Sequence, residues 1–355
     1  MNRQVAAGVC ILGTCSLQGL LIALVMLTAP AHAQSKQFKT SVASLSGENF
    51  AGSCSFELTL PAPEKPVNAV WLTYDRGYDI SRYYSDPQVV AFAEKHAIAL
   101  MLAHQCPAKE PPTHERGEME MDPSRGVGRS IFAALDSLSQ QTKHPEISSS
   151  KLIVLGFSGT GALFARFVGY APDRVLAAIL ANSGQSDPYG MDRVNLPLEA
   201  IGVPELIIVG GTDHVGGTQR NYDYFKKYRN QGAPWIFLLQ NGIPHCCVIN
   251  AKLFVLSWLE EIIKLRKPTP MKPLRRIDNL RGWAGFVCPC DSTNRDHWGE
   301  PVWNVCGAAI RPLNRPAPSN QLVSGWFPDR KLAIDWLNYT QQSEHPANSF
   351  PNPPH

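Results

Sequence analysis

Apolar residues along the chain fall into continuous runs of strand length, separated by segments in which apolar residues recur at helical spacing. A run in which nearly every residue is apolar is typical of a strand buried on both faces of a parallel sheet. The expected strands are 69–74, 98–103, 152–155, 175–181, 205–209 and 235–239, preceded by an alternating strand within 47–60. The expected helices are 87–96, 128–141, 218–230 and 248–265, together with one that follows residue 161 and ends at Pro172. This alternation predicts an α/β fold: a doubly wound, mostly parallel sheet with helices on both faces.

One turn between an expected strand and an expected helix carries a serine among three glycines. The run Leu152–Leu155 leads into Gly156-Phe-Ser-Gly-Thr-Gly161, and a helical pattern continues until Pro172. A serine at such a junction is typical of a nucleophile elbow, which exposes the hydroxyl at the end of a sheet and points helix amides at a developing anion. The usual elbow has glycine two places after the serine, where this chain has Thr160. The alternative is a structural turn whose serine caps the helix.

Two later turns could supply the groups that activate a serine hydroxyl. The serine needs a histidine to take its proton, and the histidine needs a carboxylate to fix its tautomer. Asp213 follows the strand 205–209 on a glycine-rich turn, and His245 follows the strand 235–239. Because the carboxyl ends of parallel strands lie at one edge of a sheet, we expect both to meet Ser158 there. The competing residues are Asp187 as the acid and His214, His104 or His96 as the histidine.

The chain from about Gly47 to Leu265 resembles the α/β-hydrolases. The elbow segment, together with Ala171-Pro-Asp-Arg-Val175, resembles the secreted esterase and polyester-depolymerase-like branches of that superfamily. The resemblance implies that Ser158 is the nucleophile, Asp213 the acid and His245 the base.

A hydrolase of this kind also needs donors for the oxyanion. The resemblance implies the backbone amide of Gly159 and a second amide at Tyr74, Asp75 or Arg76, in a loop that lacks the common His-Gly pair. The expected function is cleavage of small or polymeric carboxylic esters through an acyl-enzyme intermediate, with no cofactor and no metal. The alternatives are a serine peptidase or acyltransferase that uses the same three residues, and a non-catalytic binding protein with the same fold.

The first 33 residues have the features of a secretory signal. Arg3 gives the positive start, residues 19–27 the apolar centre, and Ala31-His32-Ala33 a small-residue cleavage site. A retained membrane anchor is the alternative. We expect cleavage, a secreted or periplasmic protein, and no stable membrane anchor afterwards. The formal net charge of +3 over 355 residues does not indicate a nucleic-acid partner.

Three parts are expected along the chain: the signal peptide 1–33, an α/β-hydrolase domain 34–266, and an irregular extension 267–355 that packs on the main domain. The extension is rich in proline, tryptophan and cysteine, and its pattern predicts one short helix over Asp329–Leu337.

Nine cysteines less the two in the signal leave seven, and in an exported protein these are disulfide candidates. The strand arrangement of the resembled fold implies a bond between Cys54 and Cys106. Cys246 or Cys247 could join the loop of His245 to the extension, through Cys288, Cys290 or Cys306. A metal site formed by these last three and His297 is disfavoured, because Cys-Pro-Cys is not the usual ligand spacing.

Overall fold

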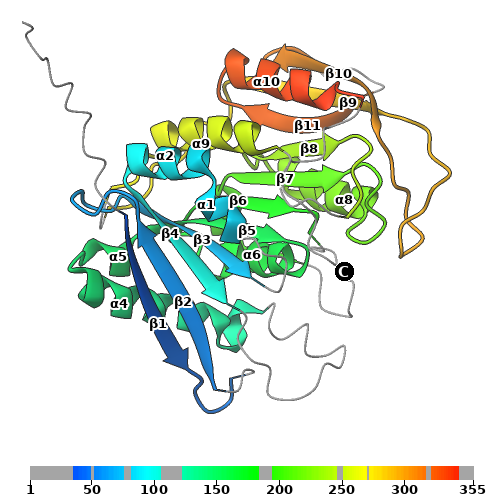
Figure 1. Cartoon of the computed structure of the whole chain (residues 1–355). Helices are drawn as coiled ribbons and strands as arrows, with labels where there is room; N and C mark the ends of the chain where they lie inside the picture. The colour runs from blue at the N-terminus through cyan, green and yellow to red at the C-terminus, as the bar shows by residue number, and fades with distance from the viewer. Residues whose placement is uncertain are drawn as a thin grey trace, which may run out of the picture. The chain divides into compact units, whose positions relative to one another are not determined.

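Figure 1 shows the computed structural model, which describes residues 35–48, 52–75, 81–104, 122–183, 194–245, 251–269, 272–316 and 321–343. An eleven-stranded sheet runs through them in the order β1-β2-β4-β3-β5-β6-β7-β8-β11-β9-β10. The strands are β1 Lys36–Ala43, β2 Ser53–Leu60, β3 Ala69–Asp75, β4 Ile98–His104, β5 Lys151–Phe157, β6 Val175–Ala181, β7 Glu205–Gly210, β8 Ile236–Gln240, β9 Trp283–Pro289, β10 Val305–Pro312 and β11 Leu322–Phe327.

The centre of the sheet is parallel. The pairs β4–β3, β3–β5, β5–β6, β6–β7 and β7–β8 all run in the same direction. Every residue of β6, β7 and β8 is buried, which accounts for their almost continuously apolar sequences; the exceptions are Glu205 at the start of β7 and Gln240 at the end of β8. The predicted fold class, an α/β fold with a mostly parallel sheet and helices on both faces, is therefore confirmed.

Helices cover the sheet on two faces, with α2 and α9 on one and α4 and α6 on the other (Figure 1). Asp86 caps the start of α2 by accepting hydrogen bonds from two amides of the first turn, with Pro87 at the first helical position. The helices are α1 Ser81–Ser85, α2 Pro87–His96, η1 Pro123–Arg125, α4 Val127–Thr142, α5 Glu146–Ser149, α6 Gly159–Tyr170, α7 Leu198–Ile201, α8 Thr218–Arg229, α9 Lys252–Arg266 and α10 Arg330–Thr340. None of the helices in the described ranges is long and apolar enough to cross a membrane.

The extension after residue 267 contributes three antiparallel strands to the same sheet. β11 pairs with β8, β9 with β11, and β10 with β9. The backbone amide of Trp326 donates to the carbonyl of Trp235 at 2.9 Å, beside the Gly325–Ile236 pair that joins the extension to the parallel strands. The sequence predicted only the helix of this segment, which is α10, with Asp329 as its cap.

Candidate active site

Ser158 lies in a strained turn between β5 and α6. Its backbone has φ 53° and ψ −123°, a conformation that side-chain-bearing residues rarely adopt. Its amide donates to the carbonyl of Ala181 at the end of β6, at 2.9 Å. Such a strained strand-to-helix turn is the geometry of a nucleophile elbow, and it leaves Ser158 half-buried at the carboxyl edge of the sheet.

Two glycines make this turn possible. Gly156 is at its usual place two residues before the serine, whereas the second, Gly161, lies three residues after it instead of two. A Cβ on Gly156 would overlap the backbone carbonyl of Thr160, and a Cβ on Gly161 would overlap the side chain of Ser183. Thr160 itself is buried and folds back on the strand: its hydroxyl donates to the carbonyl of Phe157 at 2.8 Å and accepts from the Phe157 amide at 2.9 Å. The threonine that replaces the usual glycine therefore stabilises the turn through its hydrogen bonds to Phe157.

Asp213 lies in the loop that follows β7, and its side chain is fully buried. Its Oδ1 accepts hydrogen bonds from the amides of Val215 and Gly216, both at 2.8 Å. The end of β7 is held by Asn182, whose side-chain oxygen accepts from the Gly210 amide at 2.9 Å. These backbone donors fix the direction in which the carboxylate points.

His245 lies in the loop after β8 and connects the other two residues. Its Nδ1 is 3.0 Å from both carboxylate oxygens of Asp213, and its Nε2 is 3.0 Å from Oγ of Ser158. The imidazole also packs on Phe157, with ring centroids 5.1 Å apart. Because a carboxylate can only accept, Nδ1 carries the proton and Nε2 presents its lone pair to the serine hydroxyl.

The three competing histidines have hydrogen-bond or ion-pair partners other than Ser158 and Asp213. His96 pairs with Glu260 at 2.7 Å, and His104 lies 3.4 Å from Glu57. Nδ1 of His214 is 2.8 Å from the carbonyl of Arg295. The competing acid, Asp187, lies outside the described residues.

The expected oxyanion donors are described in part. Gly159 is the first residue of α6, so its amide belongs to the helix end that favours negative charge. Tyr74 is buried within β3 and Asp75 ends that strand, while Arg76 lies outside the described residues. The sequence did not indicate the part played by Thr160 and Asn182, since each acts through contacts that only the folded protein brings together.

The cysteines of the extension pair with each other, which corrects one expectation. Cys290 and Cys306 form a disulfide with their Cα atoms 5.0 Å apart, and Cys288 is a free thiol. The proposed bonds from Cys246 or Cys247 to these three residues are therefore wrong, because β9 and β10 are neighbours and place Cys290 beside Cys306.

The remaining cysteines are only partly described. Cys54 is disulfide-bonded, while its expected partner Cys106 lies outside the described residues, as do Cys246 and Cys247. Within the described ranges, no group of three or more histidine, cysteine, aspartate or glutamate side chains is placed to hold a metal ion.

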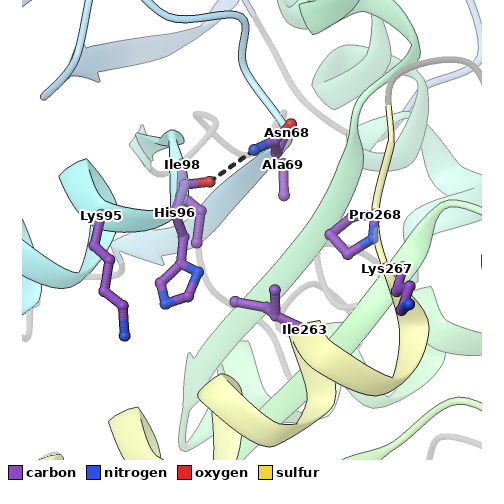
Figure 2. A pocket seen from close by; sticks show the side chains of 8 residues that line it. All are labelled: Asn68, Ala69, Lys95, His96, Ile98, Ile263, Lys267 and Pro268. Carbon is purple, nitrogen blue, oxygen red and sulfur yellow. Dashed lines mark hydrogen bonds between the residues drawn. The ribbon is translucent and has the colours of Figure 1, made fainter.

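A cavity of about 200 Å³ lies at the opposite edge of the sheet (Figure 2). It is lined in part by Ala69 and Ile98, the first residues of the parallel strands β3 and β4, and by His96 at the end of α2. Ser158 instead follows the carboxyl end of a parallel strand, so this cavity is separate from the candidate active site.

The strand order β1-β2-β4-β3-β5-β6-β7-β8, with the serine after β5, the acid after β7 and the histidine after β8, is that of the α/β-hydrolase fold. No protein-family model and no curated protein matches the sequence.

Among solved structures, the chain is similar to the S-formylglutathione hydrolase FrmB of Staphylococcus aureus (14% identity, 66% of this chain and 98% of that chain, TM-score 0.47). It is similar to an esterase of Rhizomucor miehei (14% identity, 66% and 85%, TM-score 0.46) and to the acylaminoacyl peptidase of Pyrococcus horikoshii (10% identity, 68% and 42%, TM-score 0.49). These similarities are distant and do not extend to an activity.

Proposed function

We propose that the protein is an exported serine hydrolase that cleaves carboxylic esters through an acyl-enzyme intermediate, in the manner of secreted esterases, with small or polymeric esters as substrates. One observation carries the proposal: Oγ of Ser158, both ring nitrogens of His245 and the carboxylate of Asp213 form one continuous hydrogen-bonded series. Three side chains from three separate loops take the order that nucleophilic catalysis requires.

The reaction follows from these atoms. Nε2 of His245 takes the hydroxyl proton as Oγ of Ser158 attacks the ester carbonyl carbon, and the carboxylate of Asp213 stabilises the imidazolium. The oxyanion is bound by the amide of Gly159 and a second donor near the end of β3. When the tetrahedral adduct collapses, the imidazolium gives its proton to the departing alcohol. Water, deprotonated by the same nitrogen, then releases the acid from the serine ester.

Labelling with a fluorophosphonate tests the proposal directly, because this probe reacts far faster with an activated serine than with an ordinary hydroxyl. We expect wild-type protein to be labelled and Ser158→Ala not to be. His245→Ala is expected to lose about 10⁴-fold or more in labelling rate, whereas His96→Ala, whose ring pairs with Glu260, keeps the wild-type rate. Absence of labelling in folded wild-type protein would favour the binding-protein alternative.

The ester class and the export are tested separately. Hydrolysis of p-nitrophenyl esters of increasing acyl length, compared with matched anilides and with added acceptor alcohols, distinguishes an esterase from a peptidase or an acyltransferase. Mass spectrometry of the protein recovered outside the cytoplasm is expected to find Gln34 as the first residue. A mature protein that retains residues 1–33 would contradict the proposed cleavage.

A further inference from the structure

The loops that carry Asp213 and His245 are hydrogen-bonded to each other, and the extension contacts both of them. The amide of Gly211 donates to the carbonyl of Gln240 at 2.8 Å, and the amide of Thr212 donates to that of Ile243 at 2.9 Å. These two hydrogen bonds couple the loops, so a contact that fixes one loop also restricts the other.

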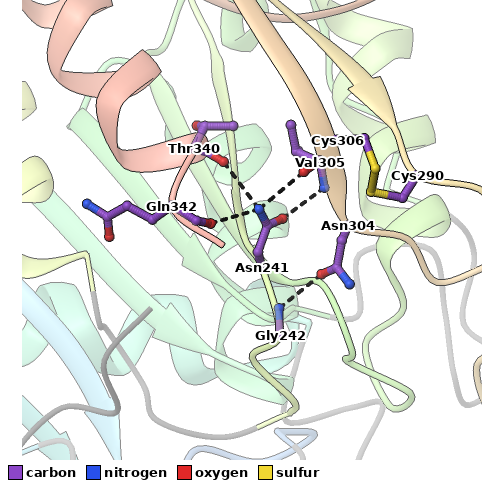
Figure 3. The surroundings of a disulfide bond; sticks show 8 residues. All are labelled: Asn241, Gly242, Cys290, Asn304, Val305, Cys306, Thr340 and Gln342. Atoms are coloured by element: carbon purple, nitrogen blue, oxygen red, sulfur yellow. Dashed lines mark hydrogen bonds between the residues drawn. A yellow bond between two sulfur atoms is a disulfide. The ribbon is translucent and has the colours of Figure 1, made fainter. Parts of the chain in front are cut away.

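Asn304, from the extension, touches both loops with one oxygen. Its Oδ1 accepts from the amide of Gly242 at 3.0 Å, three residues before His245. The same oxygen lies against Gly211, two residues before Asp213, so closely that a Cβ on that glycine would overlap it. Figure 3 shows this side chain beside Gly242, next to the disulfide.

Asn241 makes the reciprocal contact from the histidine loop into the extension. Its side chain is buried, accepts from the Val305 amide at 2.8 Å, and donates to the carbonyls of Val305 at 3.2 Å and Gln342 at 2.9 Å (Figure 3). A buried amide with both ends hydrogen-bonded fixes the relative position of the segments that it joins.

The loop that carries Asp213 is also held by residues of the extension that precede Asn304. The amide of His297 donates to the carbonyl of His214 at 2.7 Å, and the indole N–H of Trp298 donates to that of Val215 at 3.2 Å. Both acceptors belong to residues directly after Asp213. The extension thus contacts the loop of Asp213 through His297 and Trp298, and the loop of His245 through Asn304.

A disulfide joins the two ends of the segment Cys290–Cys306, which carries these contacts. Cys290 and Cys306 bracket it, and the amide of Cys290 donates to the carbonyl of Asn304 at 2.7 Å. Because Cys306 directly follows Val305, the bond also holds the partner of Asn241. A bond across the ends of a loop limits the conformations that the loop can take.

We propose that the disulfide-closed segment Cys290–Cys306 positions the catalytic acid and base, with Asn304 as the positioning residue for both loops. The proposal rests on the proposed function and deepens it: within the extension, the segment Cys290–Cys306 positions the acid and the base. A displacement of the order of 1 Å in such a constellation costs up to about 100-fold in rate.

Three variants test this. Asn304→Ala removes the acceptor of the Gly242 amide, and Asn304→Asp retains an oxygen in its place. Asn279→Ala is the matched control, because this asparagine also belongs to the extension and donates to a backbone carbonyl of the main domain, at Gly232, away from both loops. We expect Asn304→Ala to lower kcat and the fluorophosphonate labelling rate about 10-fold or more, with KM changed less than about twofold. Asn304→Asp is expected to stay within about threefold of wild type.

A structural role alone would give a different pattern. If Asn304→Ala keeps the wild-type labelling rate, or loses no more than Asn279→Ala at a similar fall in melting temperature, the proposal is wrong. If Asn304→Ala does not fold, the double variant Cys290→Ser/Cys306→Ser replaces it, with the same expected loss of labelling rate and the same refuting result.

A separate measurement keeps the two proposals distinguishable. If the wild type is not labelled at all, the proposed function fails. The positioning role is then read from the downfield proton NMR signal of His245 Nδ1–H, which reports the hydrogen bond to Asp213. We expect this signal to shift or broaden in Asn304→Ala and to be unchanged in Asn279→Ala; an unchanged signal in both would overturn the positioning role.

Discussion

Replacing Thr160 tests whether the departure from the usual elbow motif is a stabilising feature. The amide of Ser158 points toward β6, so the preceding amide of Phe157 points to the other side of the strand. On that side, the register of β3 with β5 ends at Thr73 and Leu155. The hydroxyl of Thr160 bonds both backbone groups of Phe157 just beyond that end.

The magnitude follows from these two hydrogen bonds. Thr160→Val keeps the shape of the side chain and removes both bonds, each of which contributes about 0.5–1.5 kcal/mol net, so the expected loss is about 1–3 kcal/mol. Thr160→Ser keeps the hydroxyl and loses one buried methyl group, for about 1 kcal/mol or less. Thr160→Gly restores the usual motif but loses both bonds, the buried methyl group and about 0.3–0.5 kcal/mol in helix propensity, so it is expected to be the least stable of the three.

Urea denaturation of the three variants, followed by tryptophan fluorescence, measures these differences in the free energy of unfolding. The expected order of stability is wild type, then Ser, then Val, then Gly. Thr160→Gly at or above the wild-type stability would refute the reasoning, because it would mean that the hydroxyl does not tie the turn. Thr160→Val equal to Thr160→Ser would refute it in the same way.

Three further changes test other parts of the fold. Burial raises the pKa of Glu205 well above its ordinary 4.5, so the unfolded protein ionises first and wild-type stability falls as pH rises above that value; Glu205→Gln should flatten this slope in urea titrations between about pH 4 and 8. Burial opposes ionisation of Asp86, but the hydrogen bond from Lys252 and those from the first turn of α2 outweigh it and lower the pKa of Asp86. The stability gained from the ionised Asp86 is present above its ordinary pKa of 3.8 and is lost as pH falls through the lowered pKa. Asp86→Ala should lower the free energy of unfolding by about 1–2 kcal/mol at neutral pH and remove this loss of stability at acid pH. Gly217→Ala should cost about 1–3 kcal/mol by thermal denaturation, because φ is +76° there and a Cβ would overlap the carboxylate of Asp296.

The parallel strands were predictable because their sequences are apolar without interruption, and the turns after them were predictable because topology fixes where carboxyl ends meet. β1 was not predicted, since it is an edge strand that has no fully buried residue and many polar side chains. β9 to β11 were missed because glycines within the strands and prolines at the ends of β9 and β10 interrupt the strand pattern. Their place in the sheet depends on the pairing of β11 with β8, a contact between distant parts of the chain. The overlap that requires Gly161 involves Ser183, from another segment, so the shifted glycine could only look like an imperfect motif.

The extension completes the sheet, and this bears on how the site is held. Without it, β8 would be an edge strand, and the loop that carries His245 would follow an edge. With it, β11 covers that edge, and the indole of the fully buried Trp336 donates to the carbonyl of Phe237 within β8 at 3.1 Å. The strand before the candidate base is thus fixed on both sides, by β7 and by β11. A histidine that must stay within 3.0 Å of two partners from other loops gains from a rigid support on each side, and the extension supplies one of the two.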